Sequence, residues 1–356
     1  MISVVIVTFE QAALLRSCLD SLGRSSVSHD LEVIVVDNGS PQPYAAGVLE
    51  DVGCRVLLVR LESRLTFSAA NNVGVAHSQG RWLVFANNDV IVEPLCLERL
   101  MAPLLEEPQV GVTGARLLFP GRTVQHAGIE QMLWGYGSNY GSGAAADDAR
   151  VCDDRLSWAV TGALLATSRD QYDAVRGFHE DYRFGYEDID FCLTVRENRR
   201  HIRYVASAEA VHYQSATLST GGQDDSREHN YRVFRERWDR VLVPEERHYL
   251  ARLKSEGVGR IGIIGTGIAA KGLKTVFDSA EIKVVGFAET GSTTVTTLLG
   301  RPVWSLQRMA EEPLDCVFIG SQFFAPVERA CAAIPGLGVP VFPVLSLAGG
   351  IHRAAA

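Results

Sequence analysis

The sequence predicts an α/β protein with two domains, and three observations lead to this prediction. The chain has 356 residues, more than a single hydrophobic core usually organises. Apolar, β-branched runs alternate with helical patterns through its first half. A fresh strand pattern at Arg260–Ile264 follows the polar stretch 254–257, and all the lysines lie beyond residue 250. We therefore expect a larger domain over residues 1–250 and a smaller one over residues 258–356.

Four apolar segments in the first half have the composition of buried strands: residues 3–7, 31–36, 56–59 and 82–86. Between them, Leu15, Cys18, Leu19 and Leu22 recur at helical spacing, and a second helix is expected around residues 69–78. Strands that are apolar throughout indicate a largely parallel sheet covered on both faces.

Composition and charge narrow the class of protein. Hydrophobic residues make up 47% and charged residues 21%, which is typical of a folded globular chain. The net charge of −8 argues against nucleic acid as a partner. Seven cysteines without a C-x-x-C pair resemble neither a disulfide framework nor a zinc site. The first residues lack a basic leader and no apolar run approaches a membrane span, so we expect a cytoplasmic protein.

A helix is expected over residues 227–240, and its composition leaves two interpretations open. Tyr231, Phe234 and Trp238 share one face of this helix among five arginines. The helix either packs on its own domain with a solvated basic side or lies on a membrane surface as a basic amphipathic helix.

Two acidic residues each follow an apolar strand. Asp37 begins Asp-Asn-Gly-Ser after residues 31–36, and Asp89 ends Asn-Asn-Asp after residues 82–86. Because the carboxyl ends of parallel strands meet at one sheet edge, we expect both carboxylates at the edge where such folds bind ligands. Asp37 then accepts a hydrogen bond from a nucleobase or ribose and Asp89 binds a divalent ion, or both residues simply cap turns.

A third acidic cluster and a histidine complete the candidate residues of the first domain. Glu187, Asp188 and Asp190 stand at the expected start of a helix that runs to about residue 200. A carboxylate there is either a general base for an attacking hydroxyl or an ordinary N-terminal helix acid. His212 supplies an imidazole ligand to the same ion, or it is a structural histidine.

In their order and spacing these segments resemble the inverting family 2 glycosyltransferases of GT-A fold, especially bacterial rhamnosyltransferase-like members. The resemblance covers residues 1–245. It rests on the following segments: Val5-Ile6-Val7-Thr8-Phe9, Val35-Val36-Asp37-Asn38-Gly39-Ser40, Ala70-Asn71-Asn72-Val73-Gly74, Asn87-Asn88-Asp89, Thr161-Gly162-Ala163, Gly177-Phe178, Glu187-Asp188-Ile189-Asp190 and Val211-His212.

The resemblance implies a role for each matching residue. Asp188 would be the catalytic base, Asp89 and His212 would bind Mn²⁺ or Mg²⁺, and Glu187 and Asp190 would be supporting acids. The residues implied to contact the donor are Thr8, Phe9, Asp37, Asn38, Asn71 and Asn88. Two departures stand out: the metal motif begins with an amide, Asn87, and Ser63-Arg64-Leu65-Thr66-Phe67 replaces the family's Asn-x-Gly-Phe element.

The C-terminal segment carries a glycine-rich pattern. Gly265, Gly267 and Ala270 form G-x-G-x-x-A after a strand, and Glu289 follows about 20 residues on. This pattern predicts a small Rossmann-like unit. The unit either binds the phosphate of a nucleotide ligand at a helix N-terminus or has a structural or oligomerising role.

The expected function is transfer of a sugar from a nucleotide-diphosphate sugar, dTDP-rhamnose or a UDP-sugar, to a glycan or lipid-linked acceptor in cell-surface polysaccharide synthesis. Such an acceptor would bring the enzyme to the inner membrane face. The principal alternative is a catalytically inactive, nucleotide-sensing regulatory protein, against which Asp89, Asp188 and His212 argue. The pattern at residues 265–270 also raises a weaker alternative, an NAD(P)-dependent oxidoreductase.

Overall fold

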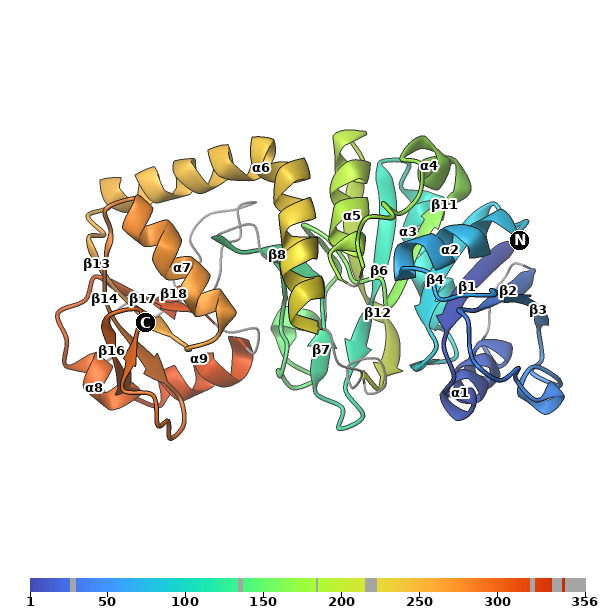
Figure 1. Cartoon of the computed structure of the whole chain (residues 1–356), viewed down its shortest axis with the longest axis horizontal. Helices are drawn as coiled ribbons and strands as arrows, with labels where there is room; N and C mark the ends of the chain where they lie inside the picture. Colours follow the sequence, from blue (N-terminus) through green and yellow to red (C-terminus); the bar gives the residue numbers. More distant parts are fainter. Residues whose placement is uncertain are drawn as a thin grey trace. The chain divides into compact units, whose positions relative to one another are not determined.

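The structure is a computed structural model, and it describes residues 1–25, 30–133, 137–183, 185–214, 223–320, 324–334 and 341–342. Two compact units divide the chain (Figure 1). The first comprises residues 1–129 and 145–236, and the second comprises residues 130–144 and 237–356. This division falls inside a long helix and assigns an internal segment to the second unit. The domain limits 1–250 and 258–356 stay a prediction.

The first unit is built on a mixed sheet. In spatial order its main path is β10-β12-β6-β11-β4-β1-β2-β3, with β5 on β12 and β7 on β6. Its strands are β1 (Ile2–Thr8), β2 (Leu31–Asp37), β3 (Arg55–Arg60), β4 (Trp82–Asn87), β5 (Val90–Val92), β6 (Val110–Leu118), β7 (Val124–His126), β10 (Arg155–Leu156), β11 (Leu164–Ser168) and β12 (His201–His212). The expected strands and the α/β class are confirmed.

The parallel part of this sheet sets up the candidate site. Strands β3, β2, β1 and β4 are parallel neighbours, and β1 is buried almost throughout. Beyond β4 the sheet is mixed, because β11 runs antiparallel between β4 and β6. The sequence predicted a largely parallel sheet, but only about half of the observed sheet is parallel. Strands that are buried on both faces have the same composition in either direction, so the pattern did not reveal the antiparallel ones.

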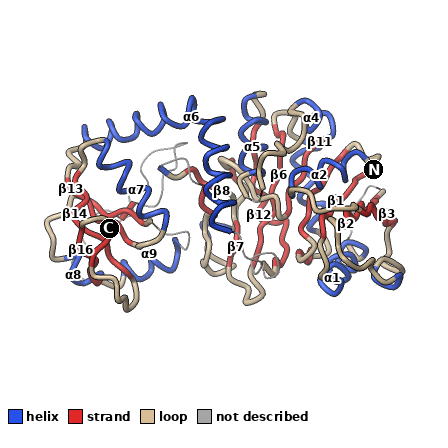
Figure 2. Tube along the Cα trace, in the orientation of Figure 1, coloured by secondary structure: helices blue, strands red, loops and turns tan. Residues whose placement is uncertain are grey.

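Helices cover the sheet of the first unit (Figure 2). They are α1 (Ala12–Gly23), α2 (Phe67–Ala76), α3 (Cys96–Glu106), α4 (Arg169–Ala174) and α5 (Glu187–Glu197), with short 3₁₀ turns at Ala46–Val48 and Ala149–Val151. Leucines of α1 and α3 join β1, β2 and β4 in one buried cluster. On α2, a Cβ at Gly74 would lie 2.4 Å from Cγ1 of Val5, so glycine lets this helix approach the sheet closely.

The predicted aromatic helix lies within α6 (Gln223–Ser255), which continues past Pro244. Phe234 is buried, with its ring centroid 4.9 Å from that of Tyr186 and 6.4 Å from that of Trp158. Trp238 is also buried. These side chains favour packing on the protein over the membrane-surface alternative. In the described ranges no helix is long and apolar enough to span a bilayer.

The second unit contains a smaller sheet in the order β15-β16-β14-β13-β17-β18. Its strands are β13 (Arg260–Ile264), β14 (Lys283–Glu289), β15 (Thr297–Leu298), β16 (Arg301–Ser305), β17 (Cys316–Ile319) and β18 (Val341–Phe342), and its helices are α7 (Ile268–Ser279), α8 (Leu306–Ala310) and α9 (Phe324–Ala332). All neighbours except β15 and β16 are parallel, in an order typical of doubly wound nucleotide-binding sheets. A separate two-stranded sheet is formed by β8 (Ile129–Gln131) and β9 (Gly137–Asn139), which, except for Ile129, lie in the internal segment of this unit.

Candidate functional site: a polar edge of the first sheet

The candidate residues of the first unit gather where β1, β2 and β4 end. In the sheet register Thr8 lies beside Asp37, and Val7 lies beside Asn87. The Asn88 side chain donates to Oγ1 of Thr8 at 3.0 Å and to Oε1 of Gln11 at 3.1 Å. Residues that are 80 positions apart in the sequence are therefore in direct contact, as the shared sheet edge requires.

Asp37 carries an unsatisfied carboxylate oxygen. The side chain is fully buried, and its Oδ1 accepts from the Ser40 N–H at 3.0 Å. Oδ2 has no hydrogen-bond partner among the described residues, and its nearest charge is Nε of Arg60 at 3.9 Å. Because a buried carboxylate oxygen without a donor is costly, this atom is suited to accept a hydrogen bond from a ligand.

Two expected donor-contacting residues are engaged within the protein. Asn38 exchanges two hydrogen bonds with the backbone of Leu65, accepting at 2.8 Å and donating at 3.1 Å. Asn71 is buried in α2 and donates to the Phe67 carbonyl at 2.9 Å. Their predicted role as donor contacts is untested, while their observed contacts shape the loop at residues 63–66 and the first turn of α2.

Phe9 and Thr8 have neighbours that the sequence did not single out. The Arg64 guanidinium lies over the Phe9 ring, 4.4 Å from its centroid. The Tyr44 hydroxyl lies 2.9 Å from Oγ1 of Thr8 and also donates to the Glu10 carbonyl. Gln11 and Glu10 both have positive φ, which is rare for such residues and often found at functional sites. Arg64, Tyr44 and Gln11 thus join the polar edge.

The candidate metal ligands, Asp89 and His212, are in contact. Nε2 of His212 lies 3.1 Å from Oδ1 of Asp89 and 3.3 Å from Nδ2 of Asn87, and both members of the pair are less than 10% exposed. The antiparallel pairing of β12 with β5 places His212 opposite Val90, next to Asp89. The structure therefore brings together the two residues that the sequence paired, and their role as metal ligands stays a prediction.

Gln125 on β7 orients His212, and no local sequence signal pointed to it. Its Oε1 lies 2.6 Å from Nδ1 of the imidazole, and its Nε2 donates to the His212 carbonyl at 3.3 Å. The second contact fixes which amide atom is the oxygen, so the N–H at Nδ1 of His212 donates to Gln125. An acceptor that holds the distal N–H is the usual companion of a metal-binding histidine.

The donor set fits a divalent ion that is completed by a ligand. In the described part of the chain, no three His, Cys, Asp or Glu side chains are grouped to hold an ion. One carboxylate and one correctly oriented imidazole are present, and the other positions would fall to water or to phosphate oxygens, as is common for Mg²⁺.

Asp188 stands in the first turn of α5, at the positive end of the helix dipole. Its Oδ2 accepts from the Gly162 N–H and its Oδ1 from the Ile189 N–H, both at 2.8 Å. Burial raises the pKa of the Asp188 carboxyl, while these two backbone donors act to lower it. A Cβ at position 162 would lie 3.3 Å from Cβ of Asp188, so Gly162 leaves room for the carboxylate.

The residues beside Asp188 differ in their environment. Burial, with the Asp188 carboxylate next in effect, raises the pKa of Glu187 to about 8, and its Oε2 has no partner among the described residues. Asp190 is buried and accepts from the Tyr182 hydroxyl at 3.0 Å. Tyr186 caps α5 with φ of 72°, a strained backbone for a tyrosine.

A short backbone path ties Asp188 to the other clusters. The Asn87 N–H donates to the Ala163 carbonyl at 2.9 Å, and Gly162 in turn holds Asp188. Nε2 of His126 also lies 3.4 Å from the Thr161 N–H. The segment 161–163 therefore connects the proposed base to the end of β4 and to the Asp89–His212 pair.

Asn72 is a structural hub near this edge. Its Oδ1 accepts from the Phe178 N–H at 3.0 Å and from the Tyr172 hydroxyl, and its Nδ2 donates to the Phe178 carbonyl at 2.9 Å. Asn72 fixes the loop that precedes α5 to helix α2. The sequence motif contained Asn72, but the predicted donor contact was its neighbour Asn71.

The candidate residues of the second unit form a separate group. Gly265 has φ of +112°, and a Cβ there would lie 2.6 Å from the Gly320 carbonyl oxygen. Gly267 caps α7 without a side-chain hydrogen bond, and a Cβ there would meet open space. Ala270 packs on Gly320, and Glu289 accepts from Thr266. Ligand binding by these residues remains a prediction.

Comparison with known proteins agrees with this architecture. A solved structure described as GalNAc-T7 with UDP, GalNAc and Mn²⁺ superposes with a TM-score of 0.56 and 15% identity, covering 80% of this chain and 55% of that one. At this identity the likeness is one of fold, and it agrees with the GT-A fold expected from the sequence. Residues 3–149 match the glycosyl transferase family 2 model. This match agrees with the family that the sequence resemblance indicated.

Two curated relatives match longer stretches of this chain. The protein y4gI of Sinorhizobium fredii is 32% identical over 245 residues, which are 66% of this chain and 26% of that protein. The O-antigen biosynthesis protein RfbC of Myxococcus xanthus is 28% identical over 225 residues, 61% of this chain and 17% of that protein. The chain therefore spans about a quarter or less of the length of these relatives.

Proposed function

We propose that the first unit transfers a sugar from a nucleotide-diphosphate sugar to a hydroxyl of a glycan or lipid-linked acceptor. The observation that carries this proposal is the joining of Asp37, Asp89–His212 and Asp188 at one sheet edge by direct contacts and short backbone links. The similarity to an O-antigen biosynthesis protein supports cell-surface polysaccharide synthesis as the process. A nucleotide-sugar donor favours the cytoplasm, at the inner membrane face if the acceptor is lipid-linked.

Asp37 would recognise the nucleoside of the donor. Its buried, unpartnered Oδ2 can accept a hydrogen bond from a base N–H or a ribose hydroxyl, which would relieve the cost of burying the carboxylate. Thr8 and the Phe9–Arg64 pair lie at the neighbouring strand end and would line the same pocket. The donor is expected to be dTDP-rhamnose or a UDP-sugar.

Asp89 and His212 would hold a divalent ion, Mn²⁺ or Mg²⁺, against the diphosphate. When bound, such an ion supplies positive charge to the diphosphate that departs. The protein's own contribution would be orientation, because the contact of Nδ1 with Gln125 turns Nε2 of His212 toward Asp89. Asn87, which stands in place of a second carboxylate, has its Nδ2 3.3 Å from the same nitrogen, Nε2.

Asp188 would act as the general base of an inverting displacement. The acceptor hydroxyl oxygen attacks the anomeric carbon from the side opposite the diphosphate, and its proton passes to Asp188. The bond from the anomeric carbon to the diphosphate oxygen breaks, and its electron pair leaves with the nucleoside diphosphate. A raised carboxyl pKa suits this role, since it makes Asp188 a better proton acceptor.

The first experiment is a donor-binding and hydrolysis screen with UDP-, GDP- and dTDP-sugars in the presence of Mn²⁺ or Mg²⁺. Asp89→Ala is the test variant, and Asp173→Ala, an exposed acid on α4, is the matched control. We expect metal-dependent binding of one donor, lost in the first variant and kept in the second. A folded wild-type protein that binds no donor would instead support the alternative of an inactive, nucleotide-sensing protein.

A second ligand site in the second unit is supported by one observation. The N-terminus of α7 has no side-chain cap and Gly267 faces open space, which leaves backbone N–H groups for a phosphate. Binding of a nucleotide to the Asp89→Ala variant, from which the first site should be lost, would test this role, and its absence would favour a structural or oligomerising unit.

A further inference from the structure

A second polar cavity lies in the first unit and has no residue in common with the site described above. Its volume is about 630 Å³, within the range of small-ligand pockets. Half of its lining residues are charged, and most of the others are apolar. The charged residues are Glu93, Arg99, Arg116, Arg122 and Glu209, and the apolar ones include Pro94, Leu95 and Ala206.

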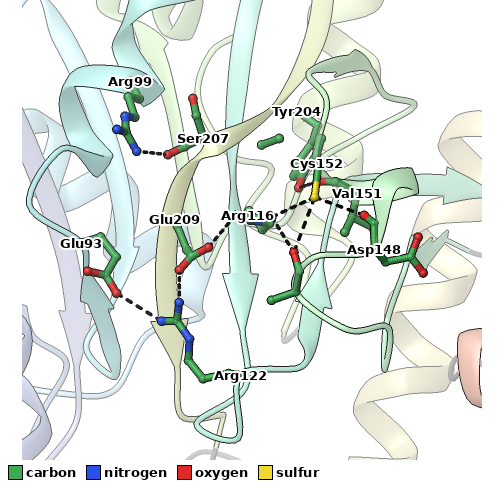
Figure 3. Close-up of polar contacts among 12 residues, drawn as sticks. Glu93, Arg99, Arg116, Arg122, Asp148, Val151, Cys152, Tyr204, Ser207 and Glu209 are labelled. Atoms are coloured by element: carbon green, nitrogen blue, oxygen red, sulfur yellow. Dashed lines mark hydrogen bonds and ion pairs between the residues drawn. The ribbon is translucent and has the colours of Figure 1, made fainter.

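Glu209 holds two of the three arginines in place (Figure 3). Its two carboxylate oxygens each accept from one guanidinium, Arg116 and Arg122, both at 2.6 Å. Arg122 also pairs with Glu93 at 3.3 Å, and its backbone has φ of 61°, a strained value for arginine. The side chains of Glu209 and Arg116 are only 13% and 15% exposed, so this is a fixed arrangement.

Arg99 on α3 is the arginine of the cavity that Glu209 does not hold. Its Nη1 donates to the Ser207 carbonyl at 2.9 Å, and it takes part in no ion pair with the residues that the structure describes. Three guanidiniums and two carboxylates give the cavity a formal charge of +1. In addition, Nε of Arg116 is buried without a hydrogen-bond partner among the described residues. A ligand that completes this cavity should carry one negative charge.

The remaining chemistry favours a sugar over a bare anion. Carboxylates such as Glu93 and Glu209 have lone pairs to accept hydroxyl hydrogens, while Leu95, 41% exposed, offers an apolar surface. A free guanidinium is the preferred partner of a carboxylate, which it binds through two parallel N–H groups. We propose that this cavity binds a carboxylate-bearing sugar, with its acid group on Arg99.

The residues of the cavity are close in sequence to those of the first site. Glu209 precedes His212 by three residues on β12, roughly 10 Å along the strand, and on the opposite face of it. Arg122 precedes Gln125 by three residues, and Glu93 follows Asp89 by four. The cavity therefore lies on the other face of the sheet from His212. Binding of the acid sugar does not depend on the proposed transferase function.

The test measures binding of glucuronic acid and of glucose, its neutral counterpart, to the full chain. Arg99→Ala is the test variant, Arg99→Gln keeps a donor for the Ser207 carbonyl, and Arg24→Ala removes an exposed arginine far along the sequence. Both Arg99 variants remove the charged hydrogen bond between the guanidinium and the carboxylate of glucuronate, so they should weaken glucuronate binding by about tenfold or more. Arg24→Ala should bind as the wild type, and glucose should bind about tenfold more weakly or not at all.

Cys152 provides a second readout, since it lines the cavity and is the exposed member of the seven cysteines. Glucuronate should slow alkylation of Cys152, and inorganic phosphate should do so less. Equal protection by phosphate, equal binding of glucose, or wild-type affinity in a folded Arg99 variant would each overturn the proposal. Donor binding is measured in the same samples. If the transferase proposal alone is wrong, the protein will bind glucuronate but no nucleotide-sugar donor.

Discussion

Replacing Gln125 by alanine tests whether His212 is oriented for a metal ion. In the structure Oε1 of Gln125 lies 2.6 Å from Nδ1 of His212, and both side chains are buried. Alanine would leave the imidazole N–H without its acceptor and free the ring to rotate. Loss of such a supporting contact typically lowers metal affinity about 10- to 100-fold, which corresponds to about 1.4–2.7 kcal/mol.

The assay is titration of the full chain with Mn²⁺ in the presence of UDP, with free Mn²⁺ followed by electron paramagnetic resonance. Gln125→Glu keeps an acceptor for the His212 N–H and should retain affinity within a few-fold of wild type, whereas His212→Ala should lose most of it. Thermal unfolding of each variant separates affinity from folding. The reasoning is refuted if folded Gln125→Ala binds Mn²⁺ like the wild type while His212→Ala does not.

Three further changes probe the same unit. Asp188→Asn should lower the transfer rate about 10²- to 10⁴-fold with donor affinity unchanged, measured by steady-state transfer and by donor titration. Asn72→Ala removes the partner of Tyr172 and of the Phe178 backbone, and should lower the free energy of unfolding in urea by roughly 2–4 kcal/mol. The pKa of Glu187 is raised to about 8 in the folded state, so the folded protein keeps this proton over a pH range in which the unfolded chain loses it. The free energy of unfolding of the wild type should therefore fall as the pH rises from the unfolded pKa to about 8, and then level off. Glu187→Gln should abolish this fall.

Each of these has a contradicting result. An Asp188→Asn variant that transfers at the wild-type rate removes the base assignment, and one that fails to bind donor indicates a binding role. A change below about 0.5 kcal/mol for Asn72→Ala, as expected for the exposed control Asp173→Ala, would mean that its contacts do not hold the loop. Parallel unfolding temperatures for wild type and Glu187→Gln from about pH 5 to about pH 9 would contradict the raised pKa.

The strands and the polar edge of the sheet could be predicted because both depend on short, contiguous stretches of sequence. An apolar β-branched run followed by a polar turn specifies Asp37 and Asp89 as strand-end residues, and parallel pairing brings them together. The direction of β11 was beyond local pattern, because a strand buried on both faces reads alike in either orientation. The length of α6 was also missed, since Pro244 lies within it and interrupts the helical signal.

The supporting residues of the site were beyond sequence reasoning for a related reason. Gln125 meets His212 across 87 positions, and Asn72 meets Phe178 across 106. A glutamine or asparagine has no local pattern that announces such a partner, and only the folded arrangement reveals it. Tyr44 and Gln11 reach Thr8 and Asn88 from loops whose course the strand pattern leaves open.

The assignment of residues 130–144 to the second unit has a consequence for how the chain is made. Met132 and Leu133 are buried, and Leu133 packs in the cluster that contains Leu250, Leu253 and Ile261. During synthesis this segment leaves the ribosome more than a hundred residues before those partners. The first unit must therefore fold around a nascent loop that stays open until the C-terminal part emerges. A gene truncated at residue 236 would yield a polypeptide with this segment permanently unpaired.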